Sequence, residues 1–225
     1  MVWTNNAIGE THNALSGAEG RYGTLVEGVP KREHFVFLID TSRSMRRGGV
    51  AYQFADLHEA LLDTLADGHP GAVVSCLTFN EQPHVQYVAD PVEVAPRLRM
   101  VAKYGNDLPV AICSCLVPTA NEFLNRDDMT VIIVTDGDTE SHTGLSSQYE
   151  ARRAISRLRA YGTKFLCLVA GANGCPPPVD SAEQIGLCED EIMSWEHTVQ
   201  SLSQAFGKVG EKLALGAARS TNDRS

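Results

Sequence analysis

The stretch from residue 34 to residue 44 reads His34-Phe35-Val36-Phe37-Leu38-Ile39-Asp40-Thr41-Ser42-Arg43-Ser44. Its apolar part shows no alternation of polar and apolar side chains, which is typical of a strand buried on both faces of a parallel sheet. An aspartate and two serines follow in alternate positions, at Asp40, Ser42 and Ser44. The stretch therefore predicts a central strand whose carboxyl end opens into a polar loop.

Strands and helices alternate along most of the chain. Apolar residues at helical spacing predict the main helices over residues 50–67, 108–124, 147–161 and 197–215. Apolar runs predict further strands over residues 72–79, 84–89, 129–135, 164–170 and 192–195. The alternation predicts an α/β fold of the Rossmann-like type. We expect a doubly wound, mostly parallel central sheet with helices on both faces and one antiparallel edge strand, residues 84–89.

The length of the chain favours one domain with extensions at both ends. At roughly 100–200 residues per domain, 225 residues are enough for a single well-buried core. Residues 1–32 are rich in polar residues and glycine and lack apolar periodicity, so we expect a poorly structured N-terminal extension. We expect the domain to cover residues 33–215 and residues 216–225 to form a flexible tail.

Composition and charge limit the kinds of partner. The formal net charge of −9 gives no electrostatic attraction to a nucleic-acid backbone, so no nucleic-acid partner is expected. Apolar runs stay short of the roughly 18 residues that a membrane span needs. The first residues lack the basic and apolar regions of a secretory signal, so we expect a cytoplasmic location.

A second predicted strand also ends in an aspartate, Asp136. The carboxyl ends of parallel strands meet at one edge of the sheet, where open α/β folds bind their ligands. The carboxylate of Asp40 and the hydroxyls of Ser42 and Ser44 can converge on one point, and Mg²⁺ prefers such oxygen ligands. These residues predict a divalent-metal site, and the simpler alternative is a cluster that caps the following helix.

The two strand ends together resemble the von Willebrand factor A (VWA) domain family. Residues 35–45 resemble the opening strand and D-x-S-x-S loop of that family, and residues 131–137 resemble its T-D-G strand end. The resemblance covers roughly residues 33–212. In residues 165–173 and 182–186 and in the final helix, it extends to stand-alone bacterial and phage members.

The resemblance implies a metal-ion-dependent adhesion site (MIDAS) that holds Mg²⁺ or Mn²⁺. Asp40, Ser42 and Ser44 match the first loop of that site, and Asp136 matches its last ligand, which often acts through a water molecule. The family has a small residue between the two serines, where this chain has Arg43.

The middle loop departs from the family pattern. The family has a threonine after a glycine, whereas this chain reads Gly105-Asn106-Asp107-Leu108. Asn106 can still offer a carbonyl oxygen to a cation. If Asp107 binds the cation instead, the added negative charge strengthens metal binding and weakens the attraction of an acidic partner. We therefore include both residues among the candidate ligands.

These observations predict a non-enzymatic protein-binding module in a regulatory or macromolecular assembly. The metal would bind an Asp or Glu side chain that a partner protein presents. One alternative is a metal-dependent phosphatase or hydrolase that uses Asp136 and Asp138, since residues 136–139 resemble the D-x-D loop of haloacid dehalogenase-like phosphotransferases. That motif has its threonine one position later and lies on the first strand of its fold. The other alternative is a metal-free scaffold with the same fold.

Overall fold

The computed structural model describes residues 31–80, 82–98, 100, 105, 107–136, 145–171 and 179–222. A six-stranded sheet lies at its centre, in the order β3-β2-β1-β4-β5-β6. The strands are β1 (Arg32–Asp40), β2 (Val73–Phe79), β3 (His84–Pro91), β4 (Asp127–Thr135), β5 (Lys164–Gly171) and β6 (Ile192–Glu196). Neighbouring strands run parallel except β2 and β3, which are antiparallel. The predicted fold class, including its antiparallel edge strand, is confirmed.

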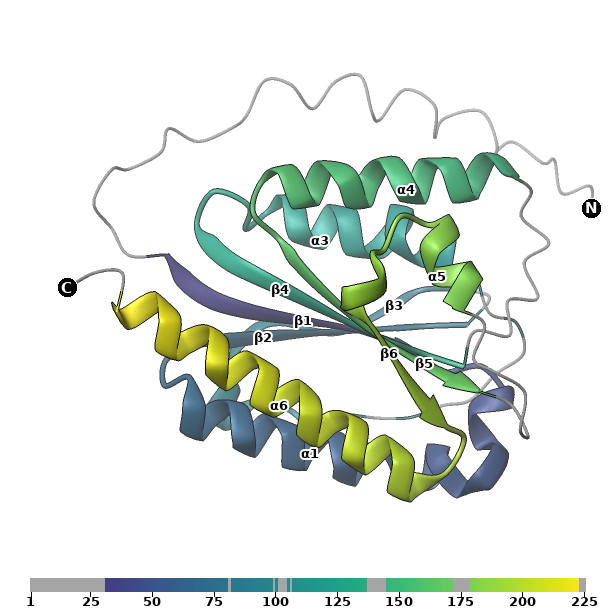
Figure 1. Cartoon of the computed structure of the whole chain (residues 1–225), viewed down its shortest axis with the longest axis horizontal. Helices are drawn as coiled ribbons and strands as arrows, with labels where there is room; N and C mark the ends of the chain where they lie inside the picture. The colour runs from purple at the N-terminus through teal and green to yellow at the C-terminus, as the bar shows by residue number, and fades with distance from the viewer. Residues whose placement is uncertain are drawn as a thin grey trace, which may run out of the picture. The chain divides into compact units, whose positions relative to one another are not determined.

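Helices cover both faces of the sheet (Figure 1). One face carries α1 (Val50–Gly68) and α6 (Val199–Asn222), and the other carries α2 (Leu108–Ala111), α3 (Val117–Asn121), α4 (Leu145–Ala160) and α5 (Val179–Gln184). Three 3-10 turns, η2 (Ser44–Gly49), η3 (Val92–Val94) and η5 (Glu189–Glu191), and one π-helical turn, η4 (Ile112–Leu116), complete the described elements. Among the described helices, none combines the length and the hydropathy that crossing a bilayer requires.

Strand β1 shows why its sequence has no polar alternation. It lies between β2 and β4, and all its residues from His34 to Asp40 are buried. Phe35, Phe37 and Ile39 pack in the core under α1 and α6, whereas Val36 and Leu38 pack in the core under α2 to α4. Both faces of the strand therefore need apolar side chains, as the sequence predicts.

A buried polar network joins four strands at the end of the sheet opposite Asp40. The Nδ1 atom of His34 lies 3.1 Å from Oδ2 of Asp127, and its Nε2 atom lies 2.8 Å from Oγ of Ser75. The Ser75 hydroxyl also accepts the backbone N–H of Ala89 at 2.9 Å. This network links β4, β1, β2 and β3 through side chains that water does not reach.

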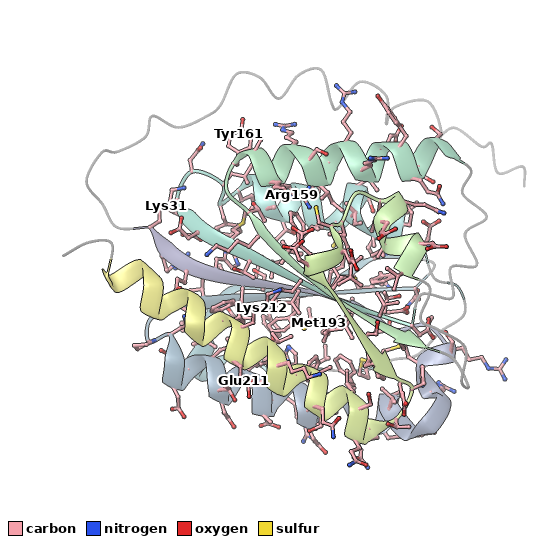
Figure 2. The ribbon with its side chains drawn as sticks, viewed as in Figure 1. Lys31, Arg159, Tyr161, Met193, Glu211 and Lys212 are labelled. Carbon is pink, nitrogen blue, oxygen red and sulfur yellow. The ribbon has the colours of Figure 1, made fainter. Side chains whose placement is uncertain are left out.

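The 3-10 turn η5, just before the edge strand β6, is held from both faces of the sheet. The guanidinium of Arg159 on α4 pairs with the Glu191 carboxylate at 2.7 Å, and the Lys212 ammonium on α6 donates to the Asp190 carbonyl at 2.7 Å (Figure 2). These two contacts fix the turn from which β6 starts, and β6 leads directly to the candidate site.

Two predicted helices differ from the observed ones. The predicted helix over residues 108–124 is a run of α2, a π-helical turn (Ile112–Leu116) and α3, and it ends at Asn121. Pro118 has no N–H for the Ser114 carbonyl and would clash with it in a regular helix, and the wider turn avoids that clash. The last helix was predicted to end at about residue 215, but α6 runs to Asn222. The residues that follow Gly216, Ala217, Ala218 and Arg219, are all strong helix formers.

Candidate metal centre

Asp40 and Asp136 lie at the same edge of the sheet because β1 and β4 are parallel neighbours. Ile39 is paired with Val134, so both chains leave the sheet side by side. The Thr135 hydroxyl donates to Oδ2 of Asp40 at 3.0 Å, and the Ser42 N–H donates to Oδ1 of Asp40 at 2.7 Å. The Asp40 side chain is completely buried. The two hydrogen bonds therefore hold its carboxylate in one orientation.

The two serines of the loop lie together. The hydroxyls of Ser42 and Ser44 are hydrogen-bonded at 2.8 Å, and the next residue, Met45, is completely buried and anchors the loop in the core. The Arg43 side chain between them is exposed. The structure thus brings the carboxylate and the two hydroxyls of the predicted loop to one place, and it turns the unusual arginine outward.

The end of β2 supports this loop in a way that sequence reasoning missed. Both the N–H and the hydroxyl of Thr41 donate to the Phe79 carbonyl, at 2.7 and 2.9 Å. The side-chain amide of the buried Asn80 donates to the Thr41 hydroxyl at 3.2 Å. The available signal is the position of Asn80 directly after a predicted strand.

The middle loop is tied to the same strand end. The Asp107 N–H donates to the Asn80 carbonyl at 3.3 Å, while the Asp107 carboxylate accepts the Val110 N–H at 3.0 Å and caps α2. Gly105 has a φ of 82°, a left-handed conformation that glycine adopts without strain. Asp107 is therefore engaged as a helix cap. Asn106 lies outside the described residues, as does Asp138 of the phosphatase alternative.

His197 is a second neighbour that the sequence did not reveal. Its Nε2 atom lies 3.8 Å from Oδ2 of Asp136, and the two side chains are only 7% and 4% exposed. The imidazole stacks on the Trp195 ring, with centroids 5.3 Å apart and planes 29° apart. Its only sequence signal is that it follows the last predicted strand.

The electrostatics of the site follow from burial of two acids. Burial and the nearby charge of Asp136 raise the pKa of Asp40 from its ordinary 3.8 to about 7, although hydrogen bonds from Ser42 and Thr135 lower it. In the described part of the chain, no three His, Cys, Asp or Glu side chains converge on one point. A cation here must therefore use serine hydroxyls as well as a carboxylate. Such an oxygen-rich shell of low charge fits a hard divalent ion.

Comparison with known proteins places this geometry in a known fold. No protein-family profile matches the sequence, and no curated protein matches it. The structure is similar to proximal thread matrix protein 1 from the mussel byssus, solved with a zinc-occupied MIDAS motif. The TM-score is 0.55 and the identity 18%, over 84% of this chain and 48% of that one.

Two further solved structures share the arrangement. The SpRpn10 VWA domain is 12% identical with a TM-score of 0.53, over 77% of this chain and 93% of that one. The pilus adhesin SpaC from Lactobacillus rhamnosus GG is 10% identical with a TM-score of 0.61, over 82% of this chain and 30% of that one. This chain thus has the VWA fold, as the sequence resemblance implies. It spans about half the length of the mussel protein and less of the adhesin.

Proposed function

We propose that this domain binds Mg²⁺ or Mn²⁺ through Asp40, Ser42 and Ser44 and uses the ion to bind an acidic side chain of a partner protein. One observation carries the proposal: a buried carboxylate, fixed by two hydrogen bonds, lies in the same loop as two hydroxyls that are 2.8 Å apart. The arrangement concentrates oxygen ligands at the edge of the sheet where α/β folds bind their ligands.

A cation would also compensate the charge that the fold buries. Asp40 is held near Asp136, and two buried carboxylates destabilise each other unless a positive charge lies close to them. The remaining ligands of the loop are neutral hydroxyls. An ion held by so few negative charges stays electrophilic, so a carboxylate from a partner can complete its shell.

The observed role of Asp107 favours an acidic partner. Its carboxylate caps α2, and a carboxylate used in this way does not add its charge to the shell of the ion. We propose that Asn106 supplies the middle-loop ligand and that Asp136 acts from the side, through water. With Asp40 as the main charged ligand, the ion attracts carboxylates more strongly than it would in a triacidic site.

A single metal–carboxylate bond contributes little contact area, so the surrounding loops must supply the rest of the interface. Stable protein interfaces bury about 1,200–2,000 Å² in total. The proposal is therefore a binding module without catalysis, in a cytoplasmic regulatory or macromolecular assembly. The zinc-occupied MIDAS of the mussel protein supports a divalent ion in this fold.

The test is a titration of Mg²⁺ and Mn²⁺ into the full chain, followed by calorimetry and thermal unfolding. At an ion concentration of about 100 Kd we expect a stabilisation of about 2.7 kcal/mol. Asp40→Asn keeps a similar shape, and its amide oxygen can still accept the Ser42 N–H, but it should lose this stabilisation. Asp128→Asn is the matched control, because Asp128 is exposed at the opposite end of β4.

Three results would contradict the proposal in different ways. A wild-type protein without any metal-dependent heat or melting shift would show that the metal site is wrong. Partner binding that survives both chelator and Asp40→Asn would support the metal-free scaffold. Turnover of phosphate esters with Mg²⁺ that Asp136→Ala abolishes would support the hydrolase alternative.

A further inference from the structure

We infer that Asn80 is a positioning residue of this metal site, which holds the first and the middle ligand loops in place relative to each other. The inference rests on the proposed function and adds a residue that does not itself touch the ion. It starts from a juxtaposition at the end of β2, where Asn80 contacts Thr41 through its side chain and Asp107 through its backbone.

The side chain of Asn80 completes a relay of hydrogen bonds to the first loop. Phe79, the residue before it, is paired with Asp40 across the sheet. The Thr41 hydroxyl donates its one proton to the Phe79 carbonyl at 2.9 Å, and its oxygen accepts the Asn80 amide at 3.2 Å. The relay is buried, because Thr41 and Asn80 are only 2% and 4% exposed. Thr41 separates Asp40 from Ser42, so a shift of Thr41 moves two of the proposed ligands.

The backbone of Asn80 holds the middle loop. Its carbonyl accepts the Asp107 N–H at 3.3 Å, and Asp107 follows Asn106, the proposed middle-loop ligand. The direction of this carbonyl depends on the side chain, because Oδ1 of Asn80 accepts the Gln82 N–H at 3.2 Å and closes a turn onto the backbone. One side chain therefore fixes both the amide that holds the first loop and the carbonyl that holds the middle loop.

The consequence of this double contact is a higher affinity for the ion. Residues that orient the ligands of a metal typically raise its affinity by roughly 10–100-fold. Mg²⁺ is sensitive to displaced ligands, since it demands near-ideal octahedral geometry with bonds of about 2.0–2.1 Å. Without the Asn80 side chain the two loops would be ordered only when the ion binds, and that ordering would weaken the binding.

A simpler role is that Asn80 only stabilises the fold, as any buried hydrogen bond does. Thr78 provides the comparison, because its buried hydroxyl accepts the Gln86 amide at 3.0 Å, which is the same type of bond on the same strand. That bond joins β2 to β3 and involves neither ligand loop. A structural role predicts that the loss of either bond lowers stability alone. A positioning role predicts that only the loss of the Asn80 bond also lowers metal affinity.

The experiment measures Kd for Mg²⁺ and Mn²⁺ by calorimetry in the full chain, beside urea unfolding without metal. We expect Thr41→Val, which keeps the shape of the side chain but loses the hydroxyl, to weaken both ions about tenfold. Thr41→Ser keeps the hydroxyl and should restore both Kd values to within about threefold of the wild type. Thr78→Val is the matched control, and it should destabilise the fold to a similar extent while both Kd values stay within about threefold.

A double-mutant cycle tests whether Asn80 acts through Thr41. Asn80→Ala should weaken both ions about tenfold or more, and adding Thr41→Val should weaken them no further. If the two effects multiply instead, the residues act independently and the relay is wrong. Asn80→Asp keeps Oδ1 for Gln82 but loses the amide donor, so it replaces the alanine variant in the cycle if that variant does not fold.

A second readout needs no metal. Hydrogen exchange of the Asp107 amide in the metal-free protein should be about fivefold faster in Asn80→Ala than in the wild type, and unchanged in Thr78→Val. Unchanged Kd values in Asn80→Ala and Thr41→Val, or equal weakening in Thr78→Val, would overturn the inference while Asp40→Asn still abolishes binding. If Asp40→Asn has no effect on either ion, the proposed function itself fails.

Discussion

At the scale of single residues, His58 of α1 shows how burial makes stability depend on pH. It is completely buried, with its ring edge-on to Phe37 at 4.8 Å, and within the described structure neither ring nitrogen has a hydrogen-bond partner. Burial lowers the pKa of His58 from 6.5 to about 4. The unfolded chain therefore binds a proton between about pH 6.5 and pH 4 that the folded protein excludes, and stability falls as the pH falls through that window.

Replacing His58 by leucine should remove this dependence. Because the two nitrogens are unsatisfied, we expect His58→Leu to stabilise the protein by about 1 kcal/mol at about pH 8. The gain should be about 2 kcal/mol larger at about pH 5, where the unfolded wild type carries the extra proton. Urea unfolding at both values measures it, with exposed His84→Leu as the control. An equal effect at both values would contradict the neutral state of His58.

The candidate site was predictable where its residues are consecutive in the sequence. Asp40, Ser42 and Ser44 share one loop, and Asp136 ends a recognisable apolar strand. Asn80 and His197 were not predictable, because their roles depend on distances between strands that only the fold sets. The role of Asp107 as a helix cap was not predictable either, because capping and metal binding use the same carboxylate oxygens.

At the scale of elements, the pairing of β3 with β2 contains a bulge that the sequence does not predict. The pairing shifts on either side of Cys76, and Ala89 has a φ of 53°. The Ser75 hydroxyl receives the Ala89 N–H, so a side chain takes the place of a backbone partner. The edge strand was predicted from its apolar residues and turn, but the bulge depends on this cross-strand bond.

This left-handed conformation predicts that glycine is tolerated at position 89 better than valine, although valine is the better strand former. A left-handed conformation costs a residue with a side chain roughly 1–2 kcal/mol, and more if the side chain is β-branched. We expect Ala89→Val to lower the free energy of unfolding by about 2 kcal/mol and Ala89→Gly to change it by less than about 1 kcal/mol. Urea unfolding measures both, and equal effects would show that the bulge relaxes.

At the scale of the whole molecule, one sheet joins two separate cores. Phe54 and Phe206 meet edge to face at 5.6 Å in the core under α1 and α6, whereas Ile155 is buried in the core under α4. Strand β1 contributes side chains to both cores. The alternation of helices and strands predicted this layering, because every crossover must return to the same sheet.

Because the sheet is shared, both cores should unfold in one transition. We expect Phe206→Ala to cost about 3–5 kcal/mol and Ile155→Ala about 2–5 kcal/mol, each by shifting a single transition. With Trp3 replaced by phenylalanine, fluorescence of the buried Trp195 reports one face, and far-ultraviolet circular dichroism reports all the helices. Coincident curves are expected for both variants, and separate midpoints would show that the faces unfold independently.

The network of Asp127, His34 and Ser75 has a consequence for reactivity. Its distances of 3.1 and 2.8 Å are those of the acid–base–nucleophile relay of serine hydrolases. Here the serine is enclosed by the sheet, and its oxygen already accepts the Ala89 amide. We expect a fluorophosphonate probe, which labels reactive serines, to leave Ser75 unlabelled. The distances alone would wrongly suggest a hydrolase. In this position the relay only holds the strands together, because no electrophile can reach the Ser75 hydroxyl.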